Sequence, residues 1–140
     1  MAKLVAFYSR AGENYFGGQY RSVTIGNTEK VANLIAETIG GNLFKIEQKV
    51  PYSPHYKYCT EQALAHKKAN VRPELVKLPD NLDSYDEIYL GYPNYWGTMP
   101  MAVFSLIAWL KNPYQGNRAE VAVHRLRKNE WALPAAATMA

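Results

Sequence analysis

The sequence predicts an α/β fold organised as a doubly wound parallel sheet, and three observations support this. Apolar runs of strand length alternate along the chain with segments of helical spacing, an order typical of right-handed crossovers between parallel strands. The first run, Leu4–Tyr8, is apolar throughout, as in a strand covered on both faces. The length of 140 residues suits one domain with a buried core, so we expect a single domain over residues 1–140.

The first half of the chain begins with the strand at Leu4–Tyr8. A long glycine-rich segment, Ser9–Gly26, follows, and we interpret it as a loop. Helical spacing starts at Asn27 and is stopped by the glycine pair at Gly40. Asn42–Glu47 alternates apolar and polar residues, which predicts a second strand nearer the edge of the sheet.

The second half repeats this alternation. Val50–Tyr58 carries two prolines and is predicted to be a loop, and Thr60–Asn70 is a helix with Thr60 as its cap. Tyr85–Tyr92 is the third strand. The turn-rich loop "PNYWGTMP" follows it, and Met101–Leu110 is an apolar helix opened by a proline.

Ligands of such sheets lie outside the carboxyl ends of the strands, where the strand order reverses. Two loops leave these ends, and the first closes with "GNT" at a helix start, where free amides and the helix dipole favour an anion such as a phosphate. Ser9 and Thr28 offer hydroxyl groups, Asn27 an amide and Arg10 a charge. The sequence leaves a second interpretation open, because Asn27 or Thr28 would serve equally well as a plain helix cap.

The second loop, residues 93–98, places two adjacent aromatic residues at a strand end. Tyr95 and Trp96 have the ring faces needed to flank a planar ligand, and they have equally the apolar surface needed to cover the core. Both interpretations remain open from the sequence.

Other functional motifs are missing from the sequence. It contains neither the GxGxxG nor the GxSxG pattern, and its three histidines have no metal-ligand spacing with Cys59, the single cysteine. The net charge of +4 favours solubility or anionic ligands, and no basic-aromatic stripe indicates nucleic acid. No run of eighteen apolar residues and no signal peptide is found, so we expect a cytoplasmic protein without a membrane segment.

The quoted motifs together resemble a known family. "LVAFYSRAG", "GNTEKVA" and "YDEIYLGYPNYWGTMPMAVFSLI" are similar to the phosphate loop, helix start and flavin-ring loop of flavodoxin-like proteins, in particular a small bacterial branch. The resemblance covers Met1–Leu110. It implies a non-covalently bound flavin mononucleotide (FMN) whose phosphate is held by Ser9, Arg10, Ala11, Asn27 and Thr28, and whose ring is lined by Pro93, Asn94, Tyr95, Trp96 and Gly97.

The resemblance also implies a function. The family transfers electrons through its flavin, so no catalytic side chain and no metal is expected. The chain would be either an electron carrier with a redox partner protein or a small reductase with a small electron acceptor. An alternative is a degenerate flavodoxin-fold interaction module with weak or no flavin binding.

The C-terminal end departs from the family pattern. Residues 1–112 match well, whereas residues 113–140 lack the family's glycine-rich loop, final helix and final strand. Arg118–Val123 is the candidate for a fourth strand. We hypothesise a truncated or out-of-frame end, which would leave an open sheet edge that a homodimer would cover.

Overall fold

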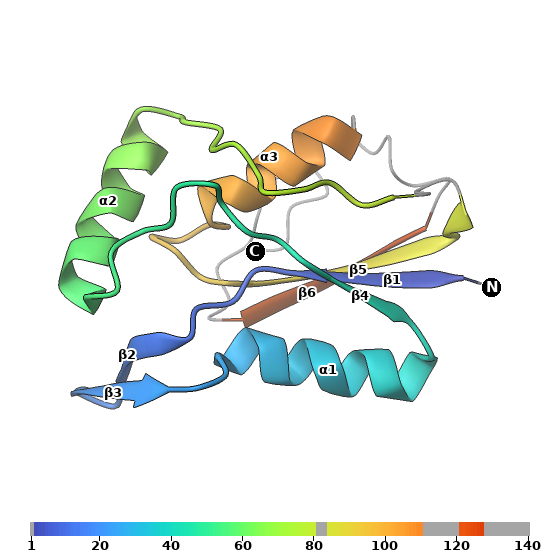
Figure 1. Cartoon of the computed structure of the whole chain (residues 1–140), viewed down its shortest axis with the longest axis horizontal. Helices are drawn as coiled ribbons and strands as arrows, with labels where there is room; N and C mark the ends of the chain where they lie inside the picture. Colours follow the sequence, from blue (N-terminus) through green and yellow to red (C-terminus); the bar gives the residue numbers. More distant parts are fainter. Residues whose placement is uncertain (1, 81–83, 111–120, 128–140) are drawn as a thin grey trace.

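The computed structural model describes residues 2–80, 84–110 and 121–127. They form three layers, with one sheet between two layers of helices (Figure 1). Helix α1 covers one face of the sheet, and α2 and α3 lie on the other. The elements of these layers are β1 (Lys3–Phe7), α1 (Asn27–Ile39), β4 (Asn42–Lys45), α2 (Tyr56–Lys68), β5 (Glu87–Pro93), α3 (Met101–Leu110) and β6 (Val121–Arg127).

The strand order is β4-β1-β5-β6, and β1 pairs in parallel with both β4 and β5. The chain therefore passes from β1 through α1 to β4 on one side of β1, and then through α2 to β5 on its other side. This confirms the predicted doubly wound sheet, with β4 at the edge of the described sheet as its alternating sequence indicated. The order reverses between β1 and β5, so their carboxyl ends form the crevice in which ligands of such sheets bind.

The core divides between the two faces of β1 because successive side chains of a strand point to opposite sides. Leu4 and Ala6 face the α3 layer, within a cluster that includes Leu90, Tyr92 and Leu106. On the opposite face lie Val5 and Phe7, which pack with Ala32 and Ala36 of α1. Burial on both faces explains why the first strand is apolar throughout.

Strand β6 lies antiparallel to β5, with Val121 opposite Pro93 and Arg127 opposite Glu87. The expected fourth strand at Arg118–Val123 thus begins at Val121 among the described residues, and it runs opposite to the other strands. Alternating hydrophobicity has the same period in both directions, so the sequence pattern did not reveal this. Residues 111–120 and 128–140, to which most of the predicted atypical segment belongs, lie outside the described residues.

The structure corrects the predicted loop Ser9–Gly26 and the predicted start of the second helix. The expected loop Ser9–Gly26 contains a β-hairpin made of β2 (Gly12–Phe16) and β3 (Gln19–Val23). Gly17 and Gly18 form its two-residue turn with positive φ angles of 51° and 93°, a hairpin signal that the loop interpretation overlooked.

Helix α2 begins at Tyr56, four residues before the predicted start at Thr60. Thr60 does not cap the helix, because its hydroxyl group donates to the carbonyl oxygen of Lys57 within it. The carboxylate of Glu13 instead accepts the amide hydrogen of Tyr56 at 2.7 Å. Glu13 belongs to the hairpin and lies 43 residues earlier in the chain, so the capping patterns of the local sequence could not reveal this contact.

Candidate functional site

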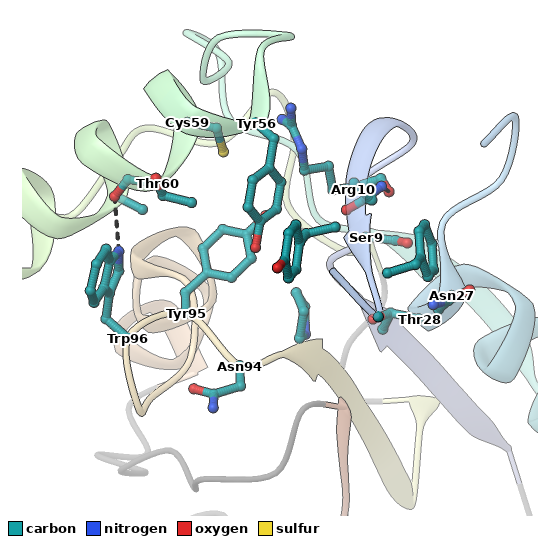
Figure 2. A pocket seen from close by; sticks show the side chains of 16 residues that line it. Ser9, Arg10, Asn27, Thr28, Tyr56, Cys59, Thr60, Asn94, Tyr95 and Trp96 are labelled. Atoms are coloured by element: carbon teal, nitrogen blue, oxygen red, sulfur yellow. Dashed lines mark hydrogen bonds between the residues drawn. The ribbon is translucent and has the colours of Figure 1, made fainter. Parts of the chain in front are cut away.

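A pocket of about 720 Å³ opens at the carboxyl ends of β1 and β5 (Figure 2). Its size lies within the range of about 300–1,000 Å³ that is usual for small-molecule sites. Eight of the ten predicted binding residues line it, namely Ser9, Arg10, Asn27, Thr28, Pro93, Asn94, Tyr95 and Trp96. Ala11 and Gly97 belong to the same loops but are not part of the lining.

One end of the pocket is the N-terminus of α1, and Gly26 determines its shape. A Cβ atom at Gly26 would lie 2.2 Å from Ser9 Oγ and 2.5 Å from the carbonyl oxygen of Arg10. Only glycine therefore allows the segment after β1 to pack against the helix start. In this arrangement Ser9 Oγ accepts the amide hydrogen of Glu29 at 3.1 Å.

The N-cap of α1 is neither of the two residues, Asn27 and Thr28, that the sequence offered for this role. The N-cap residue is Gly26, and no side chain of the helix start forms a capping hydrogen bond. The interpretation of Asn27 or Thr28 as a plain cap is therefore wrong, because the Ser9 hydroxyl group, supplied from beyond β1, takes this role.

Thr28 is the buried polar residue at this end of the pocket. Its side chain is 4% exposed, and no hydrogen-bond partner for its hydroxyl group is found within residues 2–80, 84–110 and 121–127. Buried hydroxyl groups rarely remain without a partner, so this one has the capacity to bind a ligand. The first amides of a helix also lack intrahelical acceptors. Glu29 adds little repulsion toward an anion because Lys45 pairs with it at 3.3 Å.

Arg10 lines the pocket, and three of the five N–H groups of its guanidinium bond to the protein itself. Its Nε, Nη1 and Nη2 atoms donate to the carbonyl oxygens of Glu13, Ser53 and Pro54 at 2.9, 3.0 and 2.8 Å. The guanidinium group thus ties the hairpin to the loop before α2. The positive charge of Arg10 also acts on the pocket, where it opposes the rise in the pKa of Cys59.

The other end of the pocket is the turn at Trp96 and Gly97, where both residues have positive φ angles, 56° and 82°. A positive φ is unusual for a large side chain and costs about 1–3 kcal/mol. Three contacts that involve side chains hold the turn. The Gly97 amide donates to Asn94 Oδ1 at 2.7 Å, Trp96 Nε1 donates to the Thr60 carbonyl oxygen at 2.8 Å, and Lys67 Nζ donates to the Trp96 carbonyl oxygen.

The two aromatic residues of this turn have different surroundings. Tyr95 packs against the core and meets the Tyr8 ring edge-on, with centroids 5.7 Å apart. Trp96 is 48% exposed and lies on the pocket side of the turn, beside Thr60 in Figure 2. Tyr95 therefore covers the core as well as lining the pocket, whereas Trp96 is available to flank a planar ligand.

Sequence reasoning missed a third group of lining residues. They come from the hairpin and from one face of α2, and they are Asn14, Tyr15, Phe16, Gly17, Tyr56, Cys59, Thr60 and Ala63. The α2 members are spaced by three and four residues, the spacing of one helical face. That spacing was a usable signal, but the predicted start of the helix at Thr60 placed two of the four outside it.

Burial favours the neutral forms of the Cys59 thiol and of two tyrosine hydroxyl groups in the pocket. Burial raises the pKa of the Cys59 thiol, although the charge of Arg10 opposes this. Burial also raises the pKa of the Tyr95 and Tyr56 hydroxyl groups. No carboxylate or histidine belongs to the described lining, and the described residues contain no group of three potential metal ligands.

A crevice at the point where the strand order reverses is the place where doubly wound α/β proteins bind their ligands. Residues 18–115 match the flavodoxin family model, and the chain belongs to the flavodoxin family. No curated protein matches the chain. Among the residues that the structure describes, no helix is long and apolar enough to cross a membrane.

Two of the solved structures that share the fold are flavoproteins. A flavoprotein from Lactobacillus acidophilus NCFM, in complex with FMN, has a TM-score of 0.63 and 19% identity over 81% of this chain. A provisionally assigned flavoprotein from Bacteroides eggerthii DSM 20697 has a TM-score of 0.60 and 21% identity over 77% of this chain. The chain spans 70% and 62% of their respective lengths.

Proposed function

We propose that the chain binds FMN non-covalently in this pocket and acts as a redox flavoprotein. One observation carries the proposal: the α1 N-terminus and the Trp96 turn lie at two ends of a single pocket. The first suits a phosphate, and the second suits a planar ring. The fold shared with a flavoprotein solved in complex with FMN supports the same assignment.

In this proposal the residues divide by the part of FMN that they contact. The Thr28 hydroxyl group, the Asn27 amide and Ser9 bind the phosphate, with additional charge from Arg10. Ala11, which is not part of the lining, would contribute only through its backbone. Pro93, Asn94, Tyr95 and Trp96 lie along the ring, and Gly97 allows the turn that presents Trp96.

When bound, FMN would supply the electron transfer, accepting and donating one or two electrons. The protein's own part is to bind, orient and shield the ring from water. The neutral Cys59 and tyrosine side chains fit this part because they place no charge beside the ring. No side chain is assigned a role as catalytic acid or base.

The reaction partner is either a redox protein or a small electron acceptor, and the charge favours the second. Electron carriers commonly dock through complementary charged faces, and a net charge of +4 gives no sign of an acidic face. We therefore favour a small flavin-dependent reductase. Cys59 is a buried free thiol, in agreement with a reducing cytoplasmic location. A homodimer would cover the sheet edge that the atypical C-terminal end leaves open.

Titration of the purified, flavin-free chain with FMN tests the proposal through the quenching of flavin fluorescence. We expect saturable binding of one FMN per chain, and weaker binding of riboflavin because it lacks the phosphate group. The absence of saturable FMN binding would refute the proposal and leave the degenerate interaction module as the better description.

A further inference from the structure

The backbone of the turn at Trp96 is one that a tryptophan rarely adopts. Trp96 and Gly97 are the two central residues of this turn, and the flanking residues pair across it, with the Tyr95 amide nitrogen 2.8 Å from the Thr98 carbonyl oxygen. Positive φ angles at both central residues are the mark of a type I′ turn, whose first central position usually holds asparagine, aspartate or glycine. A bulky side chain in this conformation needs support from outside the turn.

Helix α2 supplies this support from one of its faces. The carbonyl oxygen of Thr60 accepts the indole hydrogen of Trp96 at 2.8 Å (Figure 2). The ammonium group of Lys67 donates to the Trp96 carbonyl oxygen. Thr60 and Lys67 have the spacing i, i+7 and therefore lie on the same side of α2. The first contact fixes the side chain of Trp96, and the second fixes its backbone.

The peptide group between Trp96 and Gly97 is held at both of its polar ends. Its carbonyl oxygen accepts from Lys67 Nζ. Its amide donates to Asn94 Oδ1 at 2.7 Å. Rotation of this peptide group would break both hydrogen bonds, so together they select one orientation. Asn94 belongs to the same loop as the turn, whereas Lys67 ties the backbone of the turn to another element.

Helix α2 can act as a fixed support because its first turn is attached to the rest of the pocket. The carboxylate of Glu13 accepts the amide hydrogen of the first residue of the helix. Arg10 donates to two carbonyl oxygens in the segment directly before the helix. These contacts restrain the start of α2, and Lys67 lies near its other end. The helix therefore offers the turn a defined anchor.

We infer that Lys67 is a positioning residue for the ring end of the pocket, where it acts through the Trp96 carbonyl oxygen to place the indole beside a planar ligand. The inference rests on the proposed FMN site, although Lys67 itself is exposed and lies outside the pocket lining. The phosphate end of the pocket is formed by other residues, namely Ser9, Asn27 and Thr28. Loss of Lys67 should therefore weaken flavins with and without a phosphate group to the same degree.

Titration with FMN and with riboflavin tests this expectation. K67M should weaken the binding of both ligands about five-fold, because a smaller fraction of the chains then holds the turn in its binding orientation. K67R should retain most of the affinity, since it keeps a charged donor. K68M is the matched control, because Lys68 is the neighbouring exposed lysine of α2 and lies outside the lining. Unchanged affinities in K67M, a loss for FMN only, or an equal loss in K68M would overturn the inference.

A second measurement needs no flavin and separates this inference from the FMN proposal. In the W109F/W131F background, Trp96 is the one tryptophan of the chain. Acrylamide should quench its fluorescence about two-fold more strongly in K67M than in K67R or K68M, because the released turn exposes the indole further. Equal quenching in the three variants would refute the role of Lys67. The quenching difference without FMN binding to the wild type would refute the FMN proposal and support the positioning of the turn by Lys67.

Discussion

Replacing Gly26 with alanine tests how the segment after β1 is fitted to α1. The backbone at Gly26 has φ −67° and ψ 157°, a conformation that alanine adopts without strain. The cost of the substitution in the folded state therefore comes from the lack of space. The new methyl group would lie 2.2 Å from Ser9 Oγ and 2.5 Å from the Arg10 carbonyl oxygen. The first contact can be relieved by side-chain rotation, but the second requires the backbone to move.

The expected cost follows from three terms. Overpacking of a tight site costs about 1–3 kcal/mol, and displacement of Ser9 from Glu29 removes a hydrogen bond of about 1 kcal/mol. Alanine lowers the conformational entropy of the unfolded chain, which stabilises the folded state by about 0.4–1 kcal/mol. The net loss in the free energy of unfolding is therefore about 2 kcal/mol.

Urea unfolding followed by circular dichroism measures this loss as a lower midpoint at an unchanged slope. S9A alone should lose only the hydrogen bond, about 1 kcal/mol. The double variant S9A/G26A should remain less stable than S9A, because the contact with the Arg10 backbone persists. A G26A protein as stable as wild type would refute the close approach on which the phosphate end of the pocket depends.

Three further predictions concern the pocket and its surroundings. T28V should weaken the binding of FMN about ten-fold and leave the binding of riboflavin unchanged, because one charged phosphate contact is lost. Equal effects on both ligands would exclude a contact between Thr28 and the phosphate. W96A should weaken FMN about ten-fold through loss of stacking, while W109A, at an exposed site on α3, should not. Burial raises the pKa of Tyr52 to about 12 from 10.0, so the folded state holds this proton longer and stability should fall between those pH values. Y52F should flatten that fall in alkaline urea titrations, and an unchanged slope would contradict the shift.

The parts predicted from sequence are those determined by local pattern. The apolar run at Leu4–Tyr8, the helical spacing after Asn27 and the stop at Gly40 each describe one element and its burial, and each was confirmed. The carboxyl-end rule then placed Ser9, Thr28 and Trp96 at one pocket, because the topology of a doubly wound sheet brings these ends together. Their roles as FMN contacts stay a prediction until binding is measured.

Contacts between residues that are distant in the chain could be identified only from the tertiary structure. Glu13 of the hairpin accepts the amide hydrogen of Tyr56 at the start of α2, and Arg10 donates to the carbonyl oxygens of Ser53 and Pro54. Hydrophobic periodicity carries no information on such contacts, because they join segments about 40 residues apart in the chain. Local sequence patterns therefore predict the layers of the protein and the edge of the sheet at which the pocket opens. The packing of the hairpin on α2, which sequence patterns do not show, determines which side chains line the pocket and which of its charged groups have partners within the protein.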